Sequence, residues 1–86
     1  MKRDYKIIDE AGLHARPASL LVKEAGKHSN NIFIEYAGKR LTLKSILVVM
    51  SLGVPQGADI TIDVEGDNAD LVLDKLEAVL VDNKLV

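Results

Sequence analysis

The chain has 86 residues, of which 48% are hydrophobic, 28% charged and only 3% aromatic, and its formal net charge at pH 7 is −2. These values predict one soluble domain over residues 1–86, with a core of Leu, Ile, Val and Ala. The small negative charge argues against a nucleic-acid-binding surface. The absence of cysteine excludes disulfides, thiolate catalysis and cysteine-based zinc sites.

No segment of the sequence has the character of a membrane span. The longest apolar run, ILVVM at residues 46–50, is far too short to cross a bilayer. The first nine residues, MKRDYKIID, lack the apolar stretch of a signal peptide. We therefore expect a cytoplasmic protein without membrane insertion.

The first third of the chain predicts a strand followed by an amphipathic helix. Residues 4–8 alternate as a strand does. The apolar residues of the next segment follow helical spacing. Pro17 is tolerated only in the first turn of a helix, so the helix should begin near residue 15, with His14 at or beside the N-cap. Gly26 and the polar run after it indicate its end.

The rest of the chain predicts three more strands and two more helices. The strands are expected at residues 32–36, 40–43 and 60–65, and a short helix over residues 46–52 should be capped by Ser45 and ended by Gly53. A last helix, capped by Asp67 or Asn68, carries one apolar stripe: Ala69, Val72, Leu73, Leu76, Val79 and Leu80. The order βαββαβα favours an α+β fold with helices covering one face of an antiparallel sheet.

His14 stands where a helix could bind an anion. The first backbone N–H groups of a helix have no intrahelical partner and carry partial positive charge, which suits phosphate. Arg16 adds a permanently charged planar group that binds phosphate oxygens. A neutral imidazole nitrogen can attack a phosphoryl group and hold it as phosphohistidine. On spacing alone, however, a surface histidine or a weak cap is the more common interpretation.

Other chemistry has little support in the sequence. His28 is the only other histidine, and it lies near the far end of the same helix, about 20 Å away at 1.5 Å per residue. We interpret it as a solvated residue, and we expect neither a metal nor a cofactor. The serines form no recognisable triad with an oriented base.

A second signal is the segment LKSILVVMSLGV, residues 43–54. Ser45 is first of all an N-cap, and the apolar residues after it are first of all core. A helix this short and apolar on nearly every side cannot bury all its faces, however, so part of it should form an exposed patch for a partner. The expected patch comprises Leu20, Ile46, Leu47, Met50 and Leu52.

Together, GLHARPAS at residues 12–19 and LKSILVVMSLGVPQGA at residues 43–58 closely resemble the HPr family, over almost the whole chain. HPr is the histidine-containing phosphocarrier of the bacterial phosphoenolpyruvate-dependent sugar phosphotransferase system. The resemblance implies an open-faced β-sandwich, in which three helices cover one face of a four-stranded antiparallel sheet. It also implies that His14 accepts a phosphoryl group on Nδ1 from phospho-Enzyme I and passes it to Enzyme II A domains. Ala15, Arg16 and Pro17 would form the active-centre turn.

The serine segment resembles the low-GC Gram-positive branch of this family. There the residue matching Ser45 is phosphorylated by HPr kinase/phosphorylase, and the serine phosphate then recruits the catabolite control repressor. Two positions depart from that branch, which usually has methionine at Leu47 and glycine at Val48. The valine adds bulk where partners approach, which bears on kinase and repressor recognition and leaves the chemistry of His14 untouched.

Three functions stay open at this point. The first is a stoichiometric phosphocarrier for sugar uptake, which is not an enzyme with turnover of its own. The second is a regulatory binding module that is switched at Ser45. The third is a carrier in a non-sugar phosphotransferase branch. A related regulatory protein keeps the serine and lacks the histidine, so the presence of His14 favours a carrier, which we expect to be a monomer.

Overall fold

The computed structural model describes all 86 residues, and its elements follow the predicted order βαββαβα. The elements are β1 (Lys2–Lys6), α1 (Ala15–Ala25), β2 (Ile32–Tyr36), β3 (Lys39–Thr42), α2 (Ile46–Ser51), β4 (Asp59–Val64) and α3 (Ala69–Asp82).

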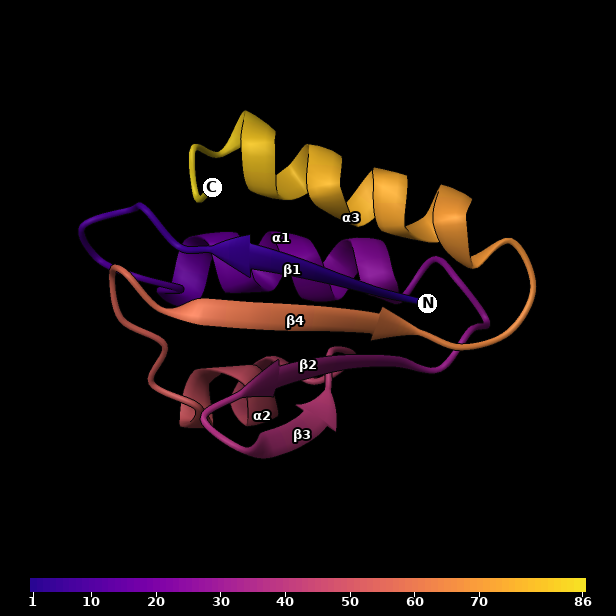
Figure 1. Cartoon of the computed structure of the whole chain (residues 1–86), viewed down its shortest axis with the longest axis horizontal. Helices are drawn as coiled ribbons and strands as arrows, with labels where there is room; N and C mark the ends of the chain where they lie inside the picture. Colours follow the sequence, from indigo (N-terminus) through magenta and orange to yellow (C-terminus); the bar gives the residue numbers. More distant parts are fainter.

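The strands form one antiparallel sheet in the order β1-β4-β2-β3. Ile34 of β2 lies opposite Ile62 of β4 on one side and Leu41 of β3 on the other. The helices pack on one face, where α1 contacts both α2 and α3 (Figure 1). This arrangement confirms the predicted open-faced sandwich with three helices on one face of a four-stranded sheet.

The core between sheet and helices is entirely aliphatic, as the composition predicts. Alternate residues of β4 point into it, and Ile60, Ile62 and Val64 are at most 1% exposed. The predicted stripe of α3 supplies the opposite wall. The four stripe residues of α3 that are fully part of the core are Val72, Leu73, Leu76 and Leu80.

Three local predictions need correction. The first strand covers Lys2–Lys6 instead of residues 4–8, because Ile7 already bonds the loop before β4, through its N–H to the Ala58 carbonyl. The β2–β3 turn contains only Ala37 and Gly38, both with positive φ, so Lys39 already belongs to β3. Asn68 occupies the N-cap position of α3, but its backbone is left-handed and its side chain makes no capping bond.

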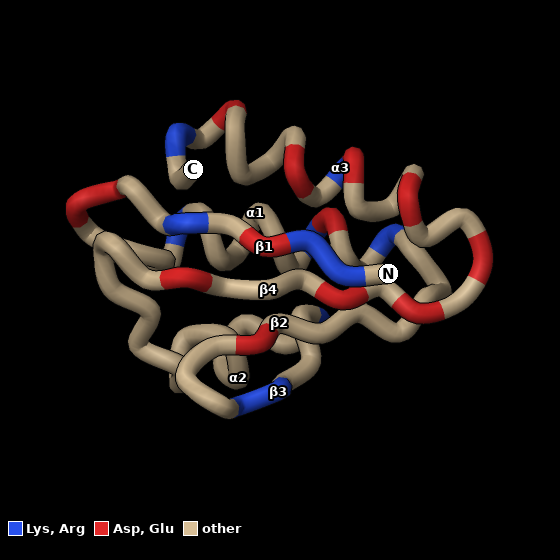
Figure 2. Tube along the Cα trace, in the orientation of Figure 1, with Lys and Arg blue, Asp and Glu red and all other residues tan.

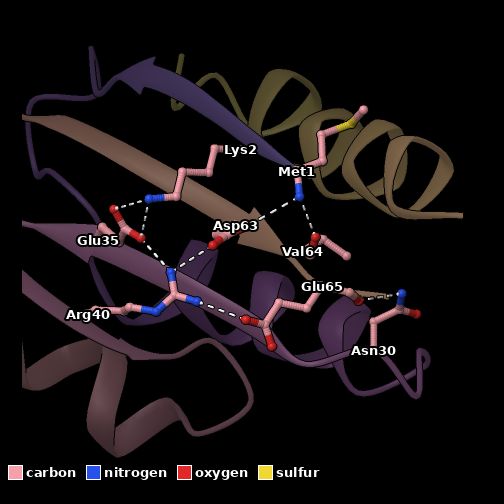
Figure 3. A network of polar contacts seen from close by, with 8 residues as sticks. All are labelled: Met1, Lys2, Asn30, Glu35, Arg40, Asp63, Val64 and Glu65. Carbon is pink, nitrogen blue, oxygen red and sulfur yellow. Dashed lines mark hydrogen bonds and ion pairs between the residues drawn. The ribbon is translucent and has the colours of Figure 1, made fainter. Parts of the chain in front are cut away.

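The open face of the sheet carries an ion-pair network centred on Arg40 (Figure 3). Arg40 Nη1 lies 2.7 Å from Asp63 Oδ2 and 2.5 Å from Glu35 Oε2, and the guanidinium lies 4.0 Å from the centre of the Phe33 ring. Asp63 is only 7% exposed. The hydrogen bond from Arg40 lowers the pKa of Asp63, and hydrogen bonds from Arg40 and then Lys2 lower the pKa of Glu35.

Charged residues of both signs are interspersed along the chain, and most of the charged residues of α3 are acidic (Figure 2). Arg3 of β1 pairs across to α3, where its Nη1 lies 2.8 Å from Asp74 Oδ1. No helix has both the length and the apolar character to cross a membrane.

Candidate functional site

His14 is the N-cap residue of α1, at the position the sequence predicts. Its backbone is extended, with φ −82° and ψ 178°, and its ring makes no capping bond. The side chain is 43% exposed. Both ring nitrogens are thus free of hydrogen bonds within the protein, and the imidazole is accessible from solvent.

The first turn of α1 leaves backbone donors free beside this ring. The helical ladder begins with Ala18, whose N–H donates to the His14 carbonyl at 3.0 Å. The N–H groups of Ala15 and Arg16 have no partner in the protein, and Pro17 has no N–H to leave unpaired. Pro17 is buried, whereas Ala15 and Arg16, which carry the two free amides, are exposed residues.

Arg16 supplies positive charge next to these amides. Its side chain is exposed, and the ion pairs of the protein are made by other cations. An arginine without an internal carboxylate partner is available for an incoming anion. Amides, guanidinium and imidazole together make this end of α1 suited to hold a phosphoryl group.

A backbone clamp that the sequence analysis missed sets the position of His14. Leu13 N–H donates to the Val54 carbonyl at 2.9 Å, which ties the loop before α1 to the loop before β4. Gly12, with φ +66°, allows this approach, because a Cβ there would lie 2.2 Å from the Val54 oxygen. Nothing in the sequence of either loop indicates this contact.

Asp9 is a second residue near His14 to which the sequence analysis assigns no role. Its Oδ2 lies 3.8 Å from His14 Nε2, and its side chain is 26% exposed. A separation of five residues across an irregular loop matches no helical or strand period. No sequence signal therefore points to this pair.

Ser45 caps α2 as predicted. Its Oγ accepts a hydrogen bond from Val48 N–H at 3.4 Å, and the residue is half-buried. The Oγ therefore lies at the start of a short helix and beside the exposed part of α2.

The expected partner patch is only partly exposed. Leu47 is 81% exposed, Met50 38% and Leu20 37%, whereas Ile46 is half-buried. Leu52 is only 7% exposed, and its assignment to the patch is wrong: it ends α2 as the C-cap and turns into the core. The exposed part, which we call the α2 patch, is Leu20, Leu47 and Met50.

The interpretation of His28 as solvated is also wrong. Its side chain is 16% exposed, and its Nε2 lies 2.8 Å from Oε2 of Glu24, in the last turn of α1. This histidine is engaged in a structural pair, whereas His14 is free of hydrogen bonds.

His14 does not line a pocket. The surface has five hollows, and none includes residues of the loop before α1 or of the first turn of α1. An accessible nucleophile outside any hollow is suited to a reaction partner that brings its own binding site, such as another protein.

Comparison with known proteins shows the family of this chain. Residues 1–82 match the family model described as the PTS HPr component phosphorylation site. The chain belongs to the HPr family. A structure of the histidine-containing phosphocarrier protein of Mycoplasma is similar at 42% identity and TM-score 0.97, over 100% of this chain and 98% of that one.

Two further solved structures are similar to this chain. HPr of Bacillus anthracis is 40% identical, with TM-score 0.83, over 92% of this chain and 94% of that one. Crh of Bacillus subtilis is a catabolite-repression protein whose crystal structure is a swapped dimer. It is 35% identical, with TM-score 0.72, over 95% of this chain and 93% of that one. The chain thus resembles both phosphocarriers and a catabolite-repression protein of the same fold.

Proposed function

We propose that this protein carries a phosphoryl group on Nδ1 of His14, accepting it from phospho-Enzyme I and donating it to Enzyme II A domains during sugar uptake. The observation that carries the proposal is an accessible His14, without hydrogen bonds, placed beside the free amides of Ala15 and Arg16. The Arg16 guanidinium and the helix N-terminus stabilise the negative charge of the transferred group.

The transfer step follows from the free ring nitrogen. The Nδ1 lone pair attacks phosphorus, the Nδ1–P bond forms, and the bond between phosphorus and the donor group of Enzyme I breaks with its electron pair leaving on the donor. The reverse sequence delivers the phosphoryl group to the acceptor. Since the protein is restored only after the second transfer, it acts as a stoichiometric carrier.

The absence of a pocket around His14 supports two successive protein partners. Donor and acceptor must each reach the same phosphoryl group, so the carrier has to present it on an open surface. The α2 patch offers apolar contact area for both partners, and Met50 adapts readily to different surfaces.

Phosphorylation by Enzyme I tests the carrier function. The protein is incubated with Enzyme I and phosphoenolpyruvate, and intact mass is followed for wild type, His14→Ala and the matched control His28→Ala. We expect one acid-labile phosphate on wild type and on His28→Ala and none on His14→Ala. Labelling of His14→Ala, or no labelling of wild type by a competent Enzyme I, would overturn the assignment.

The likeness to Crh favours a second, regulatory role at Ser45. A phosphate there adds about −1.5 to −2 charges at pH 7 at the start of α2. Those charges would lie next to the exposed Leu47 and weaken apolar docking of Enzyme I. HPr kinase/phosphorylase would add the group, and a catabolite control repressor would be the partner of the modified form.

Kinetics separate this regulatory effect from damage to the histidine. We expect Ser45→Asp to raise the KM of Enzyme I for HPr with little change in kcat, because the added charge affects docking. Ser51→Asp, at the other end of α2, is the matched control. A change confined to kcat would contradict the docking account.

A further inference from the structure

We propose that Asp9 is a positioning residue for His14: its carboxylate faces Nε2, keeps the proton on that nitrogen, and balances the charge that the ring gains when Nδ1 carries the phosphoryl group. The inference deepens the proposed function and rests on it for the phosphorylated state. The role for the free ring can be tested without Enzyme I.

Asp9 is the carboxylate that reaches the histidine. Its Oδ2 lies 3.8 Å from Nε2, and this is the only ion-pair contact that His14 makes. Nε2 and Nδ1 lie on different edges of the imidazole ring, so a carboxylate beside Nε2 leaves Nδ1 open to the phosphoryl donor. The two nitrogens of this ring thus lie in different surroundings before any partner binds.

The Asp9 carboxylate is itself held in place. Its Oδ1 accepts a hydrogen bond from Ala11 N–H at 2.8 Å, and its carbonyl accepts one from Gly12 N–H at 2.9 Å. This Asx turn uses one carboxylate oxygen and leaves Oδ2 for the histidine. The acidic loop between β1 and α1 can be followed in Figure 2.

The loop that carries Asp9 is fastened at both ends. Ile8 N–H donates to the Leu85 carbonyl at 2.7 Å, and Gln56 Nε2 donates to the Ile8 carbonyl at 3.1 Å. At the other end, Leu13 is bonded to Val54. The carboxylate is therefore placed by the fold before phosphorylation, as an orienting group needs to be.

The chemistry of the transfer uses this placement. A neutral imidazole with its proton on Nε2 has its lone pair on Nδ1, which is the form that attacks phosphorus. When the Nδ1–P bond forms, the proton stays on Nε2 and the ring becomes cationic. A small side-chain movement from 3.8 Å brings Asp9 to hydrogen-bond distance of that proton, and such contacts often tighten only in the reacting complex. When the phosphoryl group leaves, the ring returns to the neutral form with the same proton.

Asp9 and Arg16 then act on opposite parts of the site. Arg16 is exposed in the first turn of α1, from which its guanidinium can approach the phosphoryl oxygens, whereas the Asp9 carboxylate lies by Nε2 of the ring. Glu10, the adjacent acidic residue, is exposed and makes no ion pair with His14. It offers a matched control with the same charge in the same loop.

The test compares wild type, Asp9→Asn and Glu10→Gln. Asp9→Asn removes the charge and keeps an oxygen for the Ala11 amide, so the loop should retain its fold; equal thermal unfolding checks this. In the unphosphorylated proteins, ring ¹⁵N chemical shifts at alkaline pH report which nitrogen of His14 holds the proton. We expect a smaller Nε2–H fraction in Asp9→Asn alone.

The second readout is the phosphorylated protein. We expect the phosphoryl-exchange equilibrium with Enzyme I to shift about threefold or more towards the unphosphorylated protein in Asp9→Asn, because the cationic phosphorylated ring loses its counter-charge. Glu10→Gln should match wild type in both readouts. Identical ring shifts in wild type and Asp9→Asn would overturn the role of Asp9. A wild type that Enzyme I cannot label would instead refute the carrier function, and the ring shifts would still decide the role of Asp9.

Discussion

At the scale of single residues, Gly12 sets how closely the histidine loop approaches the loop before β4. Its φ of +66° is a left-handed conformation, and its Cα hydrogen occupies the place where any side chain would meet the Val54 oxygen. The hydrogen bond from Leu13 to Val54 depends on that approach. The position of the nucleophile therefore rests on a residue with no chemistry of its own.

Replacing Gly12 by alanine should damage both stability and transfer. Gly53→Ala is the matched control, because Gly53 has a similar φ of +62° with no atom within 4 Å of the added Cβ. The free energy of unfolding of the control should fall by about 1–2 kcal/mol from left-handed backbone strain alone. Gly12→Ala should lose more and also slow phosphorylation of His14. Equal losses of unfolding free energy in the two variants, measured by urea unfolding, would contradict the role of the contact between Gly12 and Val54.

Arg16 should matter for transfer and little for stability, because it is exposed and lies outside the internal ion pairs. We expect Arg16→Glu to slow phosphoryl transfer from Enzyme I by at least about 100-fold, since it places negative charge beside an incoming phosphoryl group. Arg16→Lys, which keeps the charge, should be slowed less. Rapid-quench rates measure both, and an unchanged rate in Arg16→Glu would contradict its role.

At the scale of elements, α2 is a helix whose buried side builds the core and whose exposed side is proposed to bind partners. Val49 is 1% exposed, and Leu47, two residues earlier, is 81% exposed. Residues two positions apart lie on nearly opposite sides of an α-helix, so α2 buries Val49 and leaves Leu47 in solvent.

Leu47→Glu should weaken docking without unfolding the protein. We expect the KM of Enzyme I to rise about 10-fold with kcat nearly unchanged, since a charge in an apolar contact removes binding energy shared by ground and transition states. Leu71→Glu on α3 is the matched control, because Leu71 is 56% exposed. An equal effect of the two substitutions would show that exposure alone, and not the α2 patch, is responsible.

The network on the open face of the sheet should make stability depend on pH. The pKa values of Asp63 and Glu35 are lowered, chiefly by hydrogen bonds from Arg40. Their contribution is therefore fully present above the ordinary carboxyl pKa of about 4 and is lost as the pH falls through the folded values. Urea unfolding at about pH 7 and about pH 3 should show this loss.

Arg40→Met should lower the free energy of unfolding at neutral pH, because it leaves the poorly exposed Asp63 carboxylate without its cation. It should also make the free energy of unfolding fall less between about pH 7 and about pH 3. Lys39→Met, one residue earlier on the same strand and outside the ion pairs, is the control. If the free energy of unfolding of Arg40→Met fell with acid as steeply as that of wild type, the role of Arg40 in this pH dependence would be contradicted.

At the scale of the whole molecule, periodic features were predictable from the sequence. The alternation of β4, the stripe of α3 and the start of α1 two residues before Pro17 all depend on neighbours along the chain. His14 and Arg16 could be found because Pro17 fixes where the helix begins.

Features made by contacts between distant segments were not predictable in this way. The bond from Leu13 to Val54 joins loops about 40 residues apart, and nothing in either loop specifies the other. The pairing of Asp9 with His14 depends on how the same loop is fastened. Leu52 was assigned to the surface because a short apolar helix gives no sign of which residue turns inward at its end.

The most direct test of the account is to locate the phosphoryl group by NMR. Uniformly ¹⁵N-labelled protein is phosphorylated with phosphoenolpyruvate and a catalytic amount of Enzyme I, and long-range ¹H–¹⁵N spectra of the two histidine rings are recorded. The account predicts a single phosphorylated ring, His14, modified at Nδ1 and protonated at Nε2. A phosphoryl group on His28, or on Nε2 of His14, would contradict it.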